Sequence, residues 1–502
     1  MRLRFLCDSL PAGLMFGFFA FLLRPVSTWG NTNQIYFIEN GGDILLRGPD
    51  NPGNGPVVLE WKPHSGQQTH ELMTFHRTSA GNWSRHGNRH YVNLYVLQEI
   101  RGNPKTINLR IRDPIFKLAG SFTLIQTQPR KHILQQHEIF GIKTEASPQR
   151  SVVGSDVTLS CTISRLPDTV SLQWEPKDSS QQNRRDIDQI RLNNTVYLMV
   201  RHVTVEDGKL YACQVRENGN IVLTSKADFV VTNDLYQQSY TLYRSGTDHS
   251  ELHLICFHKY KVFYFNAAWT WRSHHLQEQE KEVASVTSSQ SISVNRADFG
   301  NRLVTSVERF NGKDFSVRIV PVLFEDAGDY SCSLGSNLYL NITLITVKVT
   351  AEPPDAVTEG DNVTLTCSVS EITDSMRLVW INGDGKTVGE KIFNEQSQEE
   401  KSFQLIIPKA DGVRRKWTCC LLHENTPRFF IPHFLKTNMR TFPDIWIIAL
   451  SGYLLVKLAV ALGLICYSLG MNRGRIFMKC QVNQKGDTGI DTVVVRSTDM
   501  NC

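Results

Sequence analysis

Cysteine and lysine supply the most specific chemistry in this sequence. Eleven cysteines occur among the 502 residues, and Lys457 is the one charged residue inside a long apolar run near the C-terminus. Thiols form disulfides, bind metals or act as nucleophiles, and an ammonium inside a membrane is costly. The chain contains no H-E-x-x-H, G-x-S-x-G or Walker-type loop. The sequence therefore indicates no catalytic residue, no metal site and no cofactor, and an enzyme is the least favoured class.

The cysteines are spaced regularly with respect to tryptophans. Three of them precede a tryptophan by 13 residues, and Gly48 precedes Trp61 by the same interval. The three pairs are Cys161 with Trp174, Cys256 with Trp269 and Cys367 with Trp380. From the four starting positions to a second core position the intervals are 76, 52, 76 and 52 residues, ending at Leu124, Cys213, Cys332 and Cys419. This alternation predicts a two-domain unit duplicated in tandem.

The residues around these positions alternate as strands do. Val157, Leu159 and Cys161 fall on one face of a predicted strand, and Tyr330 lies two residues before Cys332 in a D-x-G-x-Y-x-C pattern. This frame resembles the immunoglobulin fold. The resemblance predicts an all-β protein of four tandem immunoglobulin-like sandwiches, in the order variable-like, short, variable-like, short, plus one transmembrane helix. It implies three disulfides and none in the first domain: Cys161–Cys213, Cys256–Cys332 and Cys367–Cys419.

The expected organisation follows from the strand runs and the apolar segments. It comprises a signal peptide at 1–30, a variable-like domain at 31–141, a second domain at 142–233, a variable-like third domain at 234–350, a fourth domain at 351–437, a stalk at 438–444, a transmembrane helix at 445–469 and a cytoplasmic tail at 470–502. The links between domains are short, so we expect a stiff rod. The alternative that residues 31–141 form no immunoglobulin sandwich stays open at this point.

The two ends of the chain predict a membrane location. Residues 1–30 place two arginines before an apolar run, as in a secretory signal peptide. Residues 445–469 form an apolar stretch of 25 residues, which is long enough to cross a bilayer core. Arg473 and Arg475 follow it and favour a cytoplasmic C-terminus. The predicted location is the plasma membrane, single-pass type I, with the N-terminus extracellular. The net charge of +5 gives no reason to propose nucleic acid as a partner.

Lys457 lies at the centre of the predicted span. One hypothesis is an intramembrane salt bridge to an acidic residue of a signalling adaptor, because a lysine at this depth costs about 2.5 to 3.5 kcal/mol. Residues 471–502 contain no tyrosine, so the tail carries no tyrosine-based signalling motif of its own. The alternative is an unpaired lysine whose side chain extends along the helix toward the interface.

The domain order, the duplicated pair, the single span and the short tail resemble the leukocyte receptors of the T-cell helper co-receptor and lymphocyte-activation family. This resemblance is carried by the cysteine, tryptophan and tyrosine frame over roughly residues 31–470. It implies that the distal domain, residues 31–141, binds a protein ligand on another cell, such as an MHC class II molecule. The family's paired-cysteine clasp for a kinase is not matched, because Cys480 and Cys502 are far apart.

Contact residues are sought in the first domain. The loops at one end of a variable-type sandwich form its usual binding edge. Framework alignment places residues 48–56 and 128–132 there, which makes Arg130 and Lys131 possible ligand contacts. A binding site on a sheet face is the alternative. Seven of the 15 histidines also fall in this domain, without metal-ligand spacing.

Cysteines outside the frame and the glycosylation sequons complete the predicted sites. Cys420 is the odd cysteine of the predicted exterior, and strand alternation turns it to the outer face, where it forms either an intermolecular disulfide or a free, partly covered thiol. Cys466 and Cys480 are palmitoylation candidates near the inner boundary, with an ordinary free thiol as the alternative for Cys480. The sequons are Asn82, Asn193, Asn341 and Asn362.

Two functions are compatible with these features. The first is an immune-type surface receptor that binds a protein ligand through its distal domains and signals through an adaptor subunit. The second is a cell–cell adhesion molecule whose tail has no signalling role. Clustering of the exterior with itself would favour adhesion, and selective binding to one cell type would favour the receptor.

Overall fold

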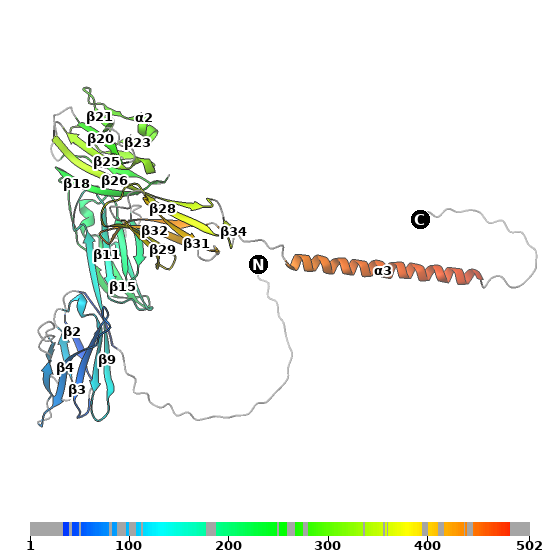
Figure 1. Ribbon diagram of the computed structural model, residues 1–502, viewed down its shortest axis with the longest axis horizontal. Coiled ribbons are helices and arrows are strands. Elements are labelled where there is room, and N and C mark those ends of the chain that lie inside the picture. The colour runs from blue at the N-terminus through cyan, green and yellow to red at the C-terminus, as the bar shows by residue number, and fades with distance from the viewer. Residues whose placement is uncertain are drawn as a thin grey trace, which may run out of the picture.

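The computed structural model shows a chain of β-sandwiches and one long C-terminal helix (Figure 1). It describes residues 34–39, 43–49, 52–79, 83–87, 97–99, 107–111, 114–176, 187–247, 250–258, 267–274, 280–334, 337–354, 357–358, 360–393, 400–409, 416–435, 437–438 and 445–481. The predicted all-β fold with a helix long enough for a membrane is confirmed. The predicted signal peptide and most of the tail lie outside the described residues.

The first sandwich encloses a core of apolar side chains that include Leu46, Leu59 and Phe122. One sheet contains β1 (Gln34–Ile38), β3 (Val57–Pro63), β4 (His70–Arg77), β5 (Trp83–Gly87), β8 (Gly120–Gln126) and the first half of β9 (His132–Ser147). The facing sheet contains β2 (Ile44–Arg47), β6 (Leu97–Glu99) and β7 (Asn108–Ile111). The short turn η1 (Phe116–Leu118) leads into β8.

The second sandwich continues from β9. One sheet adds β11 (Val157–Ile163), β14 (Thr195–Val200) and β13 (Ile187–Leu192). The facing sheet contains β12 (Val170–Pro176), β15 (Tyr211–Glu217) and β16 (Asn220–Lys226), and the short strands β10 (Arg150–Val152) and β17 (Val230–Thr232) pair beside them. In β11 buried residues point to the core that surrounds Cys161 and Cys213, as the alternation predicted.

The third sandwich has the same plan as the first. One sheet contains β18 (Gln238–Ser245), β20 (Ala267–Ser273), β21 (Lys281–Val286), β22 (Ile292–Val294), β25 (Gly328–Leu334) and the first part of β26 (Asn337–Glu352). The facing sheet contains β19 (Leu252–Leu254), β23 (Leu303–Thr305) and β24 (Val317–Ile319). Short helical turns connect these strands at α2 (Arg296–Phe299), η4 (Gly300–Arg302) and η5 (Phe324–Asp326).

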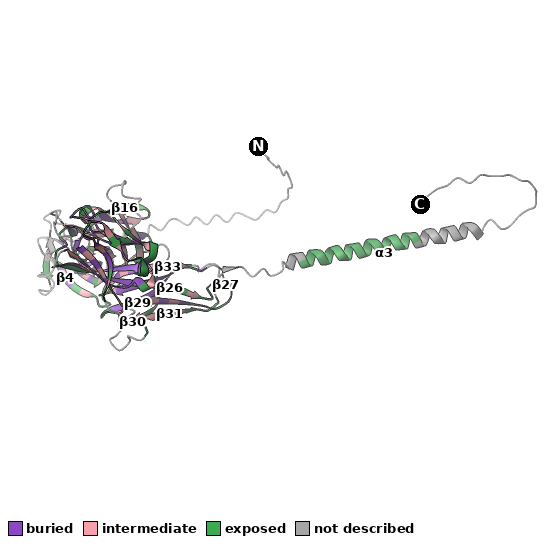
Figure 2. Cartoon of the chain, turned by 90° about the horizontal axis from the view of Figure 1, so that it is seen from above, coloured by how far each residue is buried: buried purple, intermediate pink, exposed green. Residues whose placement is uncertain are grey.

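The fourth sandwich continues from β26 with β28 (Val363–Val369) and β31 (Ser402–Ile407). The facing sheet contains β29 (Met376–Asn382), β30 (Thr387–Ile392), β32 (Lys416–His423) and β33 (Thr426–Phe434), and β27 (Val357–Thr358) pairs with β34 (Thr437–Asn438). Helix α3 (Ile445–Gln481) follows. Its segment Ile448–Leu469 has a mean hydropathy of 2.2 and is long and apolar enough to cross a membrane. Its side chains are exposed, whereas those of the strands are largely buried (Figure 2).

Two strands of 16 residues join the sandwiches in pairs. The first half of β9 pairs with β8, and its second half, from Ile142 to Ser147, pairs with β11. In the same way β26 pairs first with β25 and then, from Val347 to Glu352, with β28. A continuous strand therefore links the first domain to the second and the third to the fourth. The second and third domains are joined by a loop instead, which matches the duplication that the sequence indicated.

The framework tryptophan of the first domain differs from the expected one. Trp174, Trp269 and Trp380 each pair across the sheet with the second cysteine of their domain. In the first domain Leu59 lies opposite Leu124, while Trp61 lies opposite Phe122. Trp61 thus corresponds to the second tryptophan of the third domain, Trp271, which lies opposite Tyr330. The expectation was wrong by two residues.

The cysteine positions of the first domain were predicted correctly. Gly48 donates its N–H to the carbonyl of Ile107, as Phe315 bonds to Cys256 in the third domain. A Cβ added to Gly48 would lie 3.3 Å from Leu124 Cδ1, so these two residues face each other where a disulfide lies in the other domains. From Gly48 to Leu59 the chain needs 11 residues rather than 13. A shorter loop therefore moved Trp61 into the expected interval.

The chain folds back instead of forming the expected rod. The fourth domain lies against the second, and Figure 1 shows β29, β31 and β32 beside β11 and β15 rather than beyond the third domain. The contact is apolar. Val379, Ile381, Cys420 and Leu422 of the fourth domain are buried against Ile190 and Leu192 of the second and Phe430 of β33. The expectation of a rod failed because it considered only the length of the links between domains.

Candidate functional site at the junction of three domains

The three disulfides implied by the immunoglobulin frame are present in the structure. Their S–S distances are 2.05 Å for Cys161–Cys213, 2.06 Å for Cys256–Cys332 and 2.08 Å for Cys367–Cys419. The framework tryptophan beside each disulfide donates its indole N–H to a carbonyl of the opposite sheet: Trp174 to Val196, Trp269 to Phe315 and Trp380 to Phe403. These bonds tie the two sheets together within each sandwich.

Arg130 and Lys131 lie exposed in the loop between β8 and β9. Thr127 in this loop donates its N–H to the carbonyl of Pro56 at 2.9 Å, so the structure brings the two predicted loops together at one end of the first sandwich. Lys131 Nζ is 3.8 Å from the Glu60 carboxylate. A Cβ on Gly55 would lie 2.1 Å from the carbonyl oxygen of Gln128, so only glycine allows the two loops to approach this closely.

The histidines of the first domain serve its packing. His64 bonds Glu138 through Nε2 and Ser164 of the second domain through Nδ1, each at 2.8 Å, and so joins the two domains. His137 is fully buried, and burial lowers its pKa to about 4. His76 and His86 contact each other edge to face. In the part of the chain that the structure describes, no group of three histidine, cysteine or acidic side chains is placed to hold a metal ion.

The sequons differ in accessibility. Asn193 is exposed in the turn between β13 and β14, and Asn362 is exposed before β28. Asn341 lies within β26, half-buried, and its side-chain oxygen accepts a hydrogen bond from Ser331 at 2.7 Å. Asn82 lies outside the described residues. Asn193 and Asn362 are therefore the sequons that the structure presents to solvent.

The predicted membrane residues lie on helix α3. Lys457 Nζ is 4.8 Å from the centre of the Tyr453 ring, one helical turn away. Cys466 is exposed on the same helix. Cys480 also falls within α3, but its side chain lies outside the description. An aromatic ring attracts a cation without neutralising its charge, so Lys457 keeps its need for an anion.

Cys420 was expected on an outer face accessible to a second chain, and the structure corrects that expectation. Strand alternation does turn Cys420 away from the core of its own domain, but the second domain covers it, and the residue is 0% exposed. Burial raises the pKa of its thiol to about 12. A thiol in this position cannot reach a second copy of the chain while the fourth domain stays packed on the second.

Polar contacts surround the apolar contact between the second and fourth domains. Thr158 donates its hydroxyl to the carbonyl of Pro427 at 2.9 Å. Arg428 donates to the carbonyl of Ser147 at 3.1 Å. The guanidinium of Arg201 lies 4.8 Å from the centre of the Phe429 ring. The turn between β32 and β33 therefore attaches to β11 and to the end of β9.

A buried ion pair fixes the third domain at the same place. Arg244 of β18 is 1% exposed and bonds both carboxylate oxygens of Asp156 in the second domain, at 2.5 and 3.1 Å. The ring of His202 lies against this guanidinium, and His253 of the third domain is 4.5 Å from it, ring centre to ring centre. Burial first, and the charge of Arg244 second, hold the pKa of His202 well below its ordinary value.

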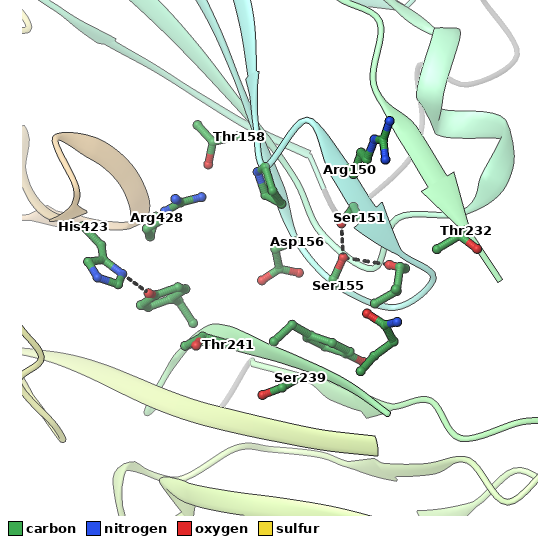
Figure 3. Close-up of a pocket in the computed structure, with 15 residues that line it drawn as sticks. Arg150, Ser151, Ser155, Asp156, Thr158, Thr232, Ser239, Thr241, His423 and Arg428 are labelled. Carbon is green, nitrogen blue, oxygen red and sulfur yellow. Dashed lines mark hydrogen bonds between the residues drawn. The ribbon is translucent and has the colours of Figure 1, made fainter. Parts of the chain in front are cut away.

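A cavity of about 400 Å³ lies where these contacts meet (Figure 3). The second domain supplies Arg150 and Asp156, the third supplies Ser239 and Thr241, and the fourth supplies Arg428 among its lining residues. Tyr243 in its wall donates to or accepts from His423 Nδ1 at 3.0 Å, and burial raises the pKa of this tyrosine to about 12. The cavity exists only while all three domains keep this arrangement.

Sequence reasoning missed this junction. One available signal was β32, where Trp417-Thr418-Cys419-Cys420-Leu421-Leu422 is apolar on both strand faces. A strand with one solvated face alternates, whereas a strand buried on both faces does not. The Arg244–Asp156 pair left no comparable signal, because both residue types are usual at exposed positions.

Comparison with known proteins supports the immunoglobulin fold at a coarse level. A family model described as Immunoglobulin domain matches residues 141–230. A CD276 antigen homolog of Xenopus laevis is 23% identical over 209 residues, covering 38% of this chain and 67% of the relative. Among solved structures, domains 3 and 4 of rat CD4 are 17% identical, with a TM-score of 0.29, and cover 39% of this chain and 100% of that one.

A titin fragment, I67–I69 of the I-band, is 15% identical with a TM-score of 0.17, and covers 60% of this chain and 98% of that one. At these TM-scores the solved structures carry no further argument. The protein is thus one with immunoglobulin-superfamily domains and a single candidate membrane helix in its described part.

Proposed function

We propose that this chain is an immune-type cell-surface receptor that crosses the plasma membrane once, with its sandwiches outside. In this proposal the first domain binds a protein ligand on another cell, and an adaptor subunit carries the signal inward. The likeness to a CD276 antigen homolog supports a surface protein of this general kind.

The observation that carries the signalling part is the charge of Lys457. Helix α3 contains no acidic residue, and Tyr453 is the one side chain that the described structure places around the ammonium. An uncompensated lysine near the bilayer midplane costs about 2.5 to 3.5 kcal/mol. A carboxylate on a neighbouring transmembrane helix would remove much of that cost and hold the two chains together.

Co-immunoprecipitation with candidate adaptors tests this pairing. We expect Lys457→Leu to abolish recovery of the adaptor and Lys457→Arg to retain much of it, because arginine keeps the positive charge. Tyr453→Leu serves as the control for a change on the same helix face and should retain the adaptor. Equal recovery by wild type and Lys457→Leu would contradict the proposal.

The ligand-binding part is supported by the paired loops of the first domain. The Arg130 and Lys131 side chains extend there into solvent, so they are free to meet an acidic partner. An MHC class II molecule is the first ligand class to test. The change Arg130→Glu with Lys131→Glu should reduce binding at least about tenfold at low salt. Lys117→Glu, in the same domain on η1, is the matched control. Unchanged binding by the double variant would exclude this loop as the contact.

Adhesion is the second candidate function. The exposed Ile133 beside the Lys131 loop supports it, because an apolar side chain next to positive charge suits a protein contact. Beads coated with the exterior of the protein distinguish the two functions. Beads that cluster with one another favour adhesion, and beads that remain dispersed while binding one cell type favour the receptor.

A further inference from the structure

The three-domain cavity has the size and place of a ligand site. Sites for small molecules usually enclose about 300 to 1,000 Å³ and often lie where domains meet. This cavity encloses about 400 Å³ between β10 and β11 of the second domain, β18 of the third and the β32–β33 turn of the fourth. Its volume suits a molecule of one or two rings.

Positive charge faces the cavity in excess. The Arg428 side chain is only 16% exposed, and the closest carboxylate that the described residues offer it, that of Glu424, is 4.0 Å away and itself largely exposed. Arg150 is exposed at the rim, and no described carboxylate pairs with it. Asp156 does not balance these charges, because Arg244 and the backbone N–H of His202 occupy its oxygens.

A sheltered guanidinium without a close carboxylate is suited to bind an anion. It offers planar, paired N–H donors that match a carboxylate. His423 adds no compensating or competing charge at neutral pH, because burial and the nearby Arg428 lower its pKa. The charge pattern therefore points to a ligand that carries a carboxylate or a similar group.

The rest of the lining is rich in hydroxyl groups. The six aliphatic hydroxyls come from all parts of the second and third domain walls: Ser151, Ser155, Thr158, Thr232, Ser239 and Thr241. The rings of Tyr240 and Tyr243 form part of the same wall. Hydroxyls both donate and accept hydrogen bonds, and aromatic rings cover apolar ring faces. A polyol ring with one acidic group combines the features that this lining would recognise.

We propose that the cavity binds a carboxylated saccharide, either a free sugar acid or the terminal residue of a glycan. Arg428 pairs with the carboxylate, Arg150 adds positive charge at the rim, and the hydroxyl side chains bond the sugar. Because all three domains contribute, a bound sugar stabilises the folded-back arrangement over any open form. The proposal is independent of the protein ligand and of the adaptor.

Isothermal titration calorimetry on the full-length chain in nanodiscs tests the proposal. The probes are glucuronic acid, glucose as the uncharged sugar and acetate as the anion without a sugar. We expect glucuronic acid to bind at least about tenfold more tightly than either control probe, because only it uses both the arginine and the hydroxyls. Immobilised glycans ending in glucuronic acid or N-acetylneuraminic acid then show whether a terminal residue is accepted as well as the free acid.

Three variants separate the site from general effects on folding. Arg428→Gln keeps an amide donor for the Ser147 carbonyl and removes the charge, so it should weaken glucuronic acid binding at least about tenfold. Arg150→Gln, at an exposed position, should weaken it about threefold without affecting the fold. Arg165→Gln, on the second domain outside the cavity, should change nothing. Equal affinities for glucuronic acid and acetate, equal affinities in all three variants, or no binding of any probe would overturn the proposal.

Discussion

The second and fourth domains present equivalent sheets with opposite outer surfaces. In the second domain, β15 alternates, and its outward residues Gln214 and Arg216 bond to Glu175 on β12 in solvent. In the fourth domain the equivalent strand β32 is buried on both faces, and its outward residues are Cys420 and Leu422. The framework of each sandwich is the same.

This difference shows that the outer face, and not the framework, decides which domain gains a neighbour. An apolar outer face gains free energy by leaving water, at about 25 cal/mol for each Å² buried. The polar outer face of the second domain gains nothing comparable. The fourth domain therefore folds back onto the second domain instead of extending the chain.

The largest effect is expected from a charge placed in the apolar contact. Leu192→Asp puts a carboxylate against Ile381 and Leu422, where the structure supplies no partner for it, at a cost of several kcal/mol. We expect the fourth domain to separate from the second and the maximum dimension in small-angle X-ray scattering to increase. Gln214→Asp, on the polar sheet of the second domain, is the matched control and should leave the scattering unchanged.

Acid should weaken the polar junction more than the apolar contact. The pKa of His202 is depressed in the folded state, so its contribution to stability is present above about pH 6.5 and is lost as the pH falls below that value. The loss is about 1.4 kcal/mol for each pH unit, or about 2 kcal/mol between pH 6.5 and 5.

Unfolding by urea at several pH values measures this effect. In His202→Asn, which also tolerates the positive φ of 53 to 50° seen at such turns here, the pH dependence of the unfolding free energy should be shallower. An equal pH dependence in the variant and the wild type would remove His202 as the cause.

The smallest effect is expected from one hydrogen bond at the edge of the contact. Thr158→Val removes the hydroxyl that bonds the Pro427 carbonyl and keeps the side-chain shape. The cost should be about 1 kcal/mol, because the carbonyl loses its partner in a buried place. Thr162→Val, on the same strand but bonded within the second domain to Thr195, should leave the contact with the fourth domain unaffected. A larger effect from Thr162 would show that Thr158 acts through its own domain.

The sequence predicted well those features that depend on local spacing. Strand alternation and the intervals to Cys213, Cys332 and Cys419 identified the sandwiches and the paired cysteines, because each sandwich requires its core residues in fixed register. The register failed at Trp61, where a loop shorter by two residues produced the expected interval by coincidence.

Features that depend on one domain meeting another were not predicted. Cys420 was correctly turned outward, but nothing in its own strand says which surface covers it. Arg244 and Asp156 are 88 positions apart in the sequence and meet only because the third domain is tilted toward the second. The cavity between three domains depends on both contacts, so its lining could not be inferred from spacing.

Thiol labelling of Cys420 tests the folded-back arrangement most directly, since the other six cysteines of the described sandwiches are in disulfides. The folded-back structure covers this thiol completely, whereas a rod would leave it on an open sheet face. We predict labelling of the exterior at least about a hundredfold slower than in denaturant, and rapid labelling in Leu192→Asp. Rapid labelling of the native wild-type protein would contradict the account.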